Sequence, residues 1–395
     1  MRIGIDARPL QHETRYRGIG KALEFFLAAL PSVLSPDDEL VFYVDKELPK
    51  PDLLNTLSKS RTILVPAPKL GRKRYIRSVL KSFTPIRPSV KDIDVLLQYD
   101  ANLGVSTRVP TVTMFHDLIP YLFRGQEKKI PAKGVRKAKN SLAGNLYWQK
   151  YLRFLKQYAK ATHVIAISES SKQDYQKHVR KNPKQPVTVV HLGVTKSHLS
   201  GKPSATAKSL AKDPYILYVG GIDLRKNVVG LAKTFYGVKE QHPKLRLLVI
   251  GKEFGLKEQL QDLGWFAVLN SNADYKKDVV VPGFLSDADL GYIYAHAEAF
   301  VFPSRYEGFG LPVLEAMQAG CPVVAYKNSS VTEISGKAAV LVKDGASMVP
   351  AVSQLLTDKN QQKTLIENGR KQVKKFTWEK TALETYRVLK AVAEK

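Results

Sequence analysis

Short apolar runs that alternate with helical patterns constrain the fold of this chain more than any other feature. In the first half such runs lie at 2–6, 39–44, 62–65, 95–98, 111–115, 163–167 and 187–191. A second series covers 215–219, 245–250, 279–281, 299–302, 323–325 and 339–342. Strands that alternate with helices indicate parallel sheets with both faces covered. The sequence therefore predicts an α/β protein with two tandem Rossmann-like, doubly wound domains.

The length of 395 residues also favours two domains of ordinary size. We place the first domain at 1–193, with Gly193 as a candidate hinge, and the second at 194–377. A final helix is expected at 378–395, with Thr377 as its N-cap, and is predicted to cross back to the N-terminal domain. In such folds ligands bind at the carboxyl ends of strands, so we expect a site in the cleft between the domains.

The charge of the chain is strongly positive and unevenly distributed. The net formal charge is +26, and residues 1–193 contribute 34 basic against 16 acidic side chains. This half is expected to meet an anionic partner such as membrane lipid, nucleic acid or a phosphorylated substrate. The alternative is a general basicity that serves solubility.

The sequence also bears on location. The single cysteine, Cys321, excludes a disulfide framework and is interpreted as a buried structural thiol. The start of the chain does not resemble a signal peptide, and no apolar run is long enough to cross a membrane. We therefore expect a cytoplasmic protein, peripheral on the inner face of the cell membrane.

A basic amphipathic pattern supports that expectation. Residues 53–91 contain no Asp or Glu, and apolar residues at 76, 79, 80 and 83 follow helical spacing. The cations predicted to face anionic lipid or the acceptor are Arg72, Lys73, Arg74, Arg77 and Lys81. The alternative is an ordinary helix whose apolar face packs on its own domain.

The segment 300–325 is the most specific stretch of the chain. A strand is expected to end near Phe302, and a helix to begin at Pro312 and to stop at Gly320. The glycines at 308 and 310 let backbone approach a ligand closely. The free N–H groups and the positive end of this helix would form an anion site.

Two glutamates flank the start of this helix. Glu307 precedes it and Glu315 lies one turn inside it. Ionised carboxylates only accept hydrogen bonds, which suits sugar and ribose hydroxyls. The alternative is a plain turn whose glutamates face water.

This segment resembles the signature of retaining nucleotide-sugar glycosyltransferases of family 4, which have the GT-B fold. In that motif two glutamates are separated by seven residues that contain Phe-Gly-Leu-Pro, as in Glu307 to Glu315. The resemblance implies that Glu307, with the backbone of Gly308, Phe309, Gly310 and Leu311, meets the donor sugar and distal phosphate. It also implies that Glu315 binds the ribose hydroxyls.

Other stretches resemble the same family. Residues 217–227 match its first donor-domain loop, in which Lys226 corresponds to the diphosphate-binding lysine. The family's usual arginine is replaced by Gly221, and Arg225 is the candidate substitute. His116 matches a histidine that approaches the donor sugar. Further donor contacts are implied for Gly18, Gly20, Gly221, Gly283 and Phe284.

The resemblance implies transfer of a mannosyl, glucosyl or rhamnosyl unit with retention of configuration in polysaccharide assembly. The catalytic residues would be His116, Glu307 and Lys226. We expect no cofactor and no metal, because Lys226 and helix-end N–H groups can neutralise the leaving diphosphate. The partners would be a GDP-, UDP- or dTDP-linked sugar and a glycan or lipid-linked glycan, with no nucleic acid. Alternatives are a transferase with a soluble acceptor, a nucleotide-sugar epimerase, or a basic nucleic-acid-binding protein.

Overall fold

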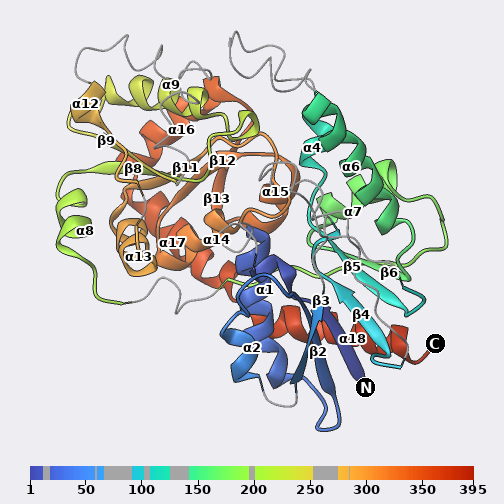
Figure 1. Cartoon of the computed structure of the whole chain (residues 1–395). Helices are drawn as coiled ribbons and strands as arrows, with labels where there is room; N and C mark the ends of the chain where they lie inside the picture. The colour runs from blue at the N-terminus through green and yellow to red at the C-terminus, as the bar shows by residue number, and fades with distance from the viewer. Residues whose placement is uncertain are drawn as a thin grey trace. The chain divides into compact units, whose positions relative to one another are not determined.

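The computed structural model of the chain divides into two compact α/β units (Figure 1). It describes residues 1–11, 18–57, 60–65, 91–101, 107–124, 142–194, 201–251, 275–283 and 285–395. One unit comprises the described residues of Met1–Leu118, Lys139–Gly193 and Thr377–Lys395. The other comprises those of Ile119–Ala138 and Val194–Phe376.

The first unit contains a parallel sheet of seven strands in the order β3-β2-β1-β4-β5-β6-β7. Its strands are β1 (Arg2–Asp6), β2 (Glu39–Asp45), β3 (Ser60–Val65), β4 (Val95–Gln98), β5 (Thr111–Phe115), β6 (His163–Ala166) and β7 (Val187–Val189). Its helices are α1 (Gly18–Ala29), α2 (Leu53–Thr56), α6 (Leu142–Tyr158), α7 (Glu169–His178) and α18 (Trp378–Ala393). Short 3-10 turns lie at η1 (Arg8–Leu10) and η3 (Leu30–Ser32).

The second unit contains a parallel sheet of six strands in the order β10-β9-β8-β11-β12-β13. Its strands are β8 (Tyr215–Val219), β9 (Arg246–Ile250), β10 (Val279–Val280), β11 (Ala299–Phe302), β12 (Val323–Tyr326) and β13 (Ala339–Val342). Its helical segments are α4 (Ile119–Leu122), α8 (Ala205–Leu210), η7 (Leu224–Lys226), α9 (Val228–Lys239), α12 (Tyr275–Asp278), α13 (Asp287–His296), α14 (Leu311–Ala319), α15 (Ser329–Ser335), α16 (Gly345–Thr357) and α17 (Lys359–Val373).

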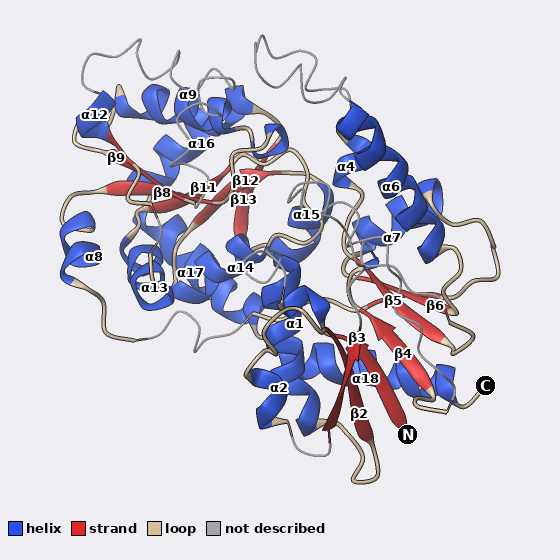
Figure 2. Cartoon of the chain, in the orientation of Figure 1, coloured by secondary structure: helices blue, strands red, loops and turns tan. Residues whose placement is uncertain are grey.

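Both sheets have helices on both faces, as Figure 2 shows. In the second unit α9 packs with α16, while α14 packs with α13 and α17. Parallel strands covered on both faces must be apolar throughout, which explains why the strands were visible as continuous apolar runs. These features confirm the predicted α/β fold of two doubly wound domains.

The last helix, α18, belongs to the first unit. Its N-cap is Thr377, whose side chain accepts a hydrogen bond from the Lys380 N–H, as predicted. Trp378 is buried with its ring centroid 5.7 Å from that of Phe25, and the helix contacts α1 and β4. A Cβ on Gly193 would lie 2.3 Å from the Trp378 nitrogen, so this glycine permits a close backbone approach. This close packing explains why glycine occupies position 193, which was predicted to be a hinge.

Candidate active site

The candidate site lies where the strand order of the second unit reverses. β8 pairs with β9 on one side and with β11 on the other. The chain runs outward through β9 and β10 and then returns to β11. Loops that leave adjacent strands in this way open a crevice at their carboxyl ends, which is where doubly wound sheets bind ligands. The loops concerned are 220–227 and 303–310.

The strand that leads into the site is firmly buried. Phe300 and Phe302 on β11 are 0% exposed, and Phe302 stacks with Tyr218 on β8. Burial of each of these side chains contributes about 2 kcal/mol to stability. The loop after β11 therefore starts from a fixed position.

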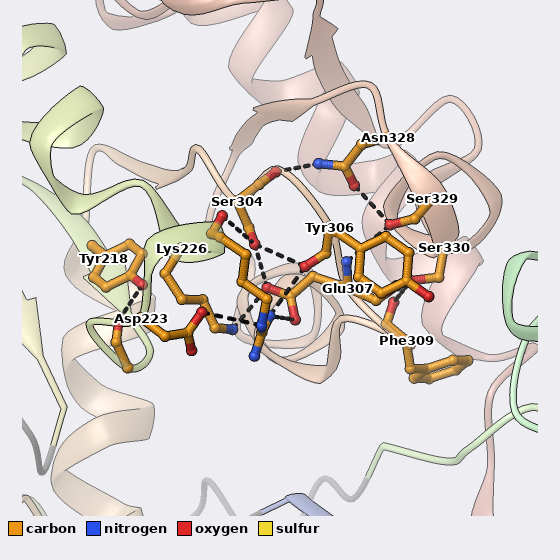
Figure 3. A network of polar contacts seen from close by, with 12 residues as sticks. Tyr218, Asp223, Lys226, Ser304, Tyr306, Glu307, Phe309, Asn328, Ser329 and Ser330 are labelled. Carbon is orange, nitrogen blue, oxygen red and sulfur yellow. Dashed lines mark hydrogen bonds and ion pairs between the residues drawn. The ribbon is translucent and has the colours of Figure 1, made fainter. Parts of the chain in front are cut away.

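A buried carboxylate, Glu307, is the centre of the site. Its Oε1 accepts hydrogen bonds from Lys226 Nζ at 2.7 Å and from Ser304 Oγ at 2.5 Å. Its Oε2 accepts one from an Arg225 guanidinium nitrogen at 2.6 Å. The side chains of Lys226 and Ser304 point toward Glu307 in Figure 3. The structure thus brings together Glu307, Lys226 and Arg225, three of the residues predicted from sequence.

The charges in this cluster determine the state of Glu307. Burial of the Glu307 carboxyl would raise its pKa, but the charges of Lys226 and Arg225 and the hydrogen bonds from Lys226 and Ser304 lower the pKa below its usual value. Lys226 is itself 8% exposed, and its ammonium lies 5.3 Å from the centroid of the Phe302 ring. The site therefore holds Glu307 and two cations in a mostly buried setting, and Arg225 also forms an ion pair with the half-exposed Asp223, whose Oδ1 lies 3.2 Å from Arg225 Nε.

The loop that carries the cations is fixed by backbone contacts. Arg225 and Lys226 lie in η7, which Asn227 ends in the left-handed conformation at φ 55°. Asn adopts this conformation more readily than most residues. The Arg305 N–H donates to the Arg225 carbonyl oxygen at 2.7 Å, which joins the loops after β8 and β11.

A third segment, which comprises Asn328 and the first turn of α15, also supports Glu307. The Glu307 N–H donates to Ser329 Oγ at 2.9 Å. The buried Ser330 hydroxyl lies 2.9 Å from the Glu307 carbonyl oxygen and 2.7 Å from that of Phe309. The Asn328 amide donates to the Ser304 carbonyl oxygen. Ser329 has φ 26°, an unusual value of the kind that clusters at functional sites.

The helix after the loop, α14, begins at Leu311 rather than at the predicted Pro312. Pro312 still lies in the first turn, and the helix ends at Ala319 with Gly320 in the left-handed conformation. The difference arises because Gly310, at φ 107°, already serves as the N-cap. A Cβ on Gly310 would lie 3.0 Å from Ile334 Cδ1, so both the φ value and the packing favour glycine.

Glu315 occupies a different environment on the same helix. It is partly buried and accepts a hydrogen bond from the Tyr294 hydroxyl at 3.2 Å. Burial, with a smaller contribution from the charge of Asp287, raises the pKa of Glu315 to about 7 despite that hydrogen bond. Glu315 can therefore exchange a proton near neutral pH, whereas Glu307 stays ionised.

The glycines predicted to contact a donor have distinct local roles. The Gly221 carbonyl oxygen accepts a hydrogen bond from the Tyr218 hydroxyl at 2.7 Å. Gly308 is buried in the loop before α14. Gly283 has φ 81°, a conformation that favours glycine. The Phe309 ring packs edge-on against the Phe376 ring, with 5.9 Å between the ring centroids. Because the ring is engaged in this way, Phe309 would contact a ligand through its backbone.

Two predicted glycines and His116 lie in the first unit. Gly18 and Gly20 were expected in a loop, but they form the first turn of α1. This prediction was wrong because the buried face of α1, which includes Leu23 and Phe26, already begins at Gly20 in the first turn. His116 follows β5, is 7% exposed, and donates from Nε2 to the Tyr99 carbonyl oxygen at 2.8 Å.

Several predictions fall on residues outside the described ranges. These residues are Arg72, Lys73, Arg74, Arg77, Lys81 and Phe284. Among the helices that the structure does describe, none combines the length and apolar character that a membrane span requires. Within the same residues, no three His, Cys, Asp or Glu side chains are grouped as metal ligands.

The residues that support Glu307 were missed in the sequence. They are Ser304, Asn328, Ser329 and Ser330. A usable signal existed, because Ser304 precedes Glu307 by three residues and a polar Asn-Ser-Ser run follows the apolar run 323–325. Polar residues at the carboxyl ends of neighbouring parallel strands meet at one edge of a sheet.

Models of known protein families match both halves of the chain. The family model "Glycosyltransferase Family 4" matches residues 33–198, and the model "Glycosyl transferases group 1" matches residues 204–372. The O-antigen chain mannosyltransferase B of Escherichia coli is 33% identical over 183 residues, which cover 46% of this chain and 47% of that protein. The chain thus spans about half the length of this curated relative.

Solved structures share the fold over almost the whole chain. Sucrose-phosphate synthase from Thermosynechococcus elongatus has a TM-score of 0.70 at 21% identity and covers 99% of both chains. Anabaena Alr3699/HepE, solved in complex with UDP and glucose, has a TM-score of 0.65 at 15% identity over 99% of this chain and 100% of that one. Since the two family models follow each other along most of the sequence, this chain belongs to family 4 of the glycosyltransferases, which have the GT-B fold.

Proposed function

We propose that this protein transfers a hexosyl unit from a nucleoside-diphosphate sugar to a glycan or lipid-linked glycan. The observation that carries the proposal is the pair of cations, Arg225 and Lys226, held on Glu307 at the carboxyl ends of β8 and β11. Family membership and the mannosyltransferase relative support the class of reaction.

The cations are suited to a leaving diphosphate. Cleavage of the bond between the sugar C1 and the diphosphate oxygen leaves negative charge on the phosphate. Lys226 and Arg225 neutralise that charge, and the N–H groups at the start of α14 add fixed dipoles. In the free protein Glu307 accepts hydrogen bonds from both cations. Donor binding therefore exchanges part of this pairing for phosphate contacts, which leaves carboxylate oxygens of Glu307 available to sugar hydroxyls.

Glu315 is assigned to the ribose hydroxyls. Its carboxyl is half-buried and is held by one hydrogen bond from the Tyr294 hydroxyl. A ligand that donates hydroxyl hydrogens stabilises the carboxylate form and so offsets the burial that raises its pKa. Nucleotide binding is then linked to proton release from Glu315 near neutral pH.

The stereochemistry and the metal requirement are parts of the same proposal. Retention of the anomeric configuration is implied by the motif from Glu307 to Glu315, and we propose attack on the same face, assisted by the donor phosphate. Metal independence is supported by the two cations and the helix N-terminus, which supply the charge that a metal would supply. A β-linked product from an α-linked donor would overturn retention. Loss of activity in EDTA would overturn metal independence.

A turnover assay tests the proposed function directly. The protein is incubated with UDP-, GDP- and dTDP-linked hexoses, with and without lipid-linked glycan, and nucleoside diphosphate release is followed. A transferase releases nucleoside diphosphate faster when the acceptor is present and elongates the glycan by one sugar. Release that is independent of every acceptor, with isomerised sugar as the product, would identify an epimerase instead.

A further inference from the structure

A second basic site lies beside the Glu307 network, in the same unit. An open cavity of about 450 Å³ is lined by Arg305, Tyr326, Lys327, Asn328, Lys343, Asp344 and Gly345. Tyr326 is the last residue of β12 and the other residues follow β11, β12 or β13, so the cavity lies at the carboxyl ends of three neighbouring strands. Carboxyl-end loops of parallel sheets are the usual place for ligands.

Three cations line the cavity. Arg305, Lys327 and Lys343 each come from a different loop and are exposed. None of the three forms an ion pair with a residue in the described part of the chain, and Arg305 makes a 3.3 Å hydrogen bond to the neutral Asn227 side chain. Exposed cations that converge on one concavity raise the local concentration of anions.

The acidic residue at this cavity, Asp344, has a structural role. Its carboxylate is the N-cap of α16 and accepts hydrogen bonds from the Ser347 N–H at 2.9 Å and from Ser347 Oγ at 2.6 Å. Three cations and one carboxylate leave two net positive charges at the cavity. A phosphate monoester carries about −1.5 to −2 charges at pH 7, so its charge matches this surplus.

The cavity is physically joined to the proposed donor site. The Asn328 amide at its wall donates to the Ser304 carbonyl oxygen, and Ser304 donates to Glu307. Arg305 precedes Glu307 by two residues in the same loop. Figure 3 shows the hydrogen bond between Asn328, which follows β12, and Ser304, which follows β11. The cations assigned to the donor diphosphate, Arg225 and Lys226, do not line the cavity, so it offers charge for another anion.

We propose that this cavity binds a phosphate group of the acceptor, so that the enzyme acts on a phosphorylated glycan or a phosphate-linked glycan carrier. The inference rests on the proposed transferase function, since it assigns the second anion to the acceptor. Lys327 and Lys343 hold the phosphate charge, while Arg305 can form two parallel hydrogen bonds to its oxygens.

Titration with inorganic phosphate tests the cavity by itself. The Lys226→Ala background removes one of the two cations proposed for the donor phosphates, and Arg225 is the same in both variants that are compared. In that background the double variant Lys327→Ser/Lys343→Ser is compared with Lys363→Ser/Lys371→Ser, which removes two exposed lysines from α17. We expect phosphate affinity to fall about tenfold in the cavity variant and to stay unchanged in the control. An equal fall in both variants, or no fall in either, would overturn the proposal.

Two further measurements distinguish failure of this inference from failure of the proposed function, and a phosphate site from a general anion site. The cavity variant with Lys226 intact should bind nucleoside diphosphate as tightly as the natural protein. If no nucleoside diphosphate binds the natural protein, the proposed function fails, whereas the phosphate titration still decides the cavity. Mannose 1-phosphate should displace bound phosphate at much lower concentration than glucuronate does. Equal displacement by the two would contradict a phosphate site.

Discussion

Two glutamates of one motif, eight positions apart, have opposite electrostatic environments. Glu307 accepts hydrogen bonds from Lys226, Arg225 and Ser304, and the two cations keep its pKa low although it is buried. Glu315 has the Tyr294 hydroxyl as a partner, and burial raises its pKa to about 7. Pairs of titratable groups whose environments separate their pKa values often divide binding and chemical roles.

The Glu315→Gln variant is expected to be more stable than the natural protein above pH 7. The pKa of Glu315 is raised to about 7 in the folded protein from an ordinary value of 4.5. Between these two pH values the folded state binds more protons than the unfolded state, so its stability falls as pH rises. Gln does not titrate, so its advantage should grow across this window and reach at most about 3 kcal/mol.

Thermal unfolding at pH 4.5 and pH 8 measures this difference. The control is Glu367→Gln, an exposed residue on α17, whose effect should not change with pH. A Glu315→Gln variant with the same relative stability at both pH values would show that burial does not disfavour the charged form.

The Glu307→Gln variant is expected to lose turnover while it keeps nucleoside diphosphate affinity. In the natural protein Lys226 and Arg225 are paired with Glu307, so a diphosphate competes with this carboxylate. Removal of its charge frees Lys226 for phosphate oxygens, whereas Arg225 keeps its ion pair with Asp223. Calorimetry with the preferred nucleoside diphosphate should give a Kd equal to or below that of the natural protein. A Kd about tenfold higher would mean that Glu307 helps diphosphate binding by orienting the cations, and that this effect outweighs its competition with the diphosphate for them.

At the scale of elements, α14 depends on the glycine that precedes it. Gly310 has φ 107°, and a side chain there would meet Ile334 at 3.0 Å. We expect Gly310→Ala to destabilise the protein by about 1–3 kcal/mol, because it adds backbone strain to a crowded position. The matched control is Gly18→Ala at the start of α1, where a Cβ meets nothing within 4 Å. Denaturant unfolding should separate the two variants, and equal stabilities would contradict the strain argument.

The strands could be predicted because buried parallel strands are apolar throughout. The runs at 95–98, 111–115 and 299–302 correspond residue for residue to β4, β5 and β11. The start of α1 was misplaced because glycine is a poor helix former, although Gly20 already belongs to the buried face of this helix. Local propensity is thus weaker evidence here than the apolar pattern.

The contacts within the site were harder to predict from the sequence than the identity of its residues. Lys226 and Glu307 were each identified by resemblance, but they are 81 residues apart and meet because β8 and β11 are neighbours. Ser304 and Ser330 act through hydrogen bonds that depend on the course of three loops. A sequence pattern does not contain those distances, so these residues were identified only from the structure.

At the scale of the whole molecule, charge is the feature that the fold does not explain. The net charge is +26, and the half at 1–193 carries most of it. Neither sheet needs such a surplus, because their cores are apolar. Electrostatic association with an anionic surface is a use that follows from charge alone.

We expect the protein to float with phosphatidylglycerol vesicles at low salt and to be released near 0.5 M salt, as surface charges are then screened beyond about 4 Å. Neutral phosphatidylcholine vesicles should not retain it. Reversal of Arg72, Lys73 and Arg74 to Glu should weaken flotation more than the Lys363→Glu/Lys371→Glu/Lys374→Glu control on and after α17. Equal flotation of the two variants would exclude the basic run 53–91 as the contact.

The central claim is that a lysine clamped on a buried glutamate binds the diphosphate of a nucleotide sugar. Isothermal titration of UDP, GDP and dTDP into the natural protein, Lys226→Ala and the exposed α9 control Lys233→Ala tests it most directly. We predict that one of these nucleotides binds the natural protein and Lys233→Ala equally, and binds Lys226→Ala about 10- to 100-fold more weakly. Absence of binding by all three nucleotides, or equal affinity in Lys226→Ala, would contradict the account.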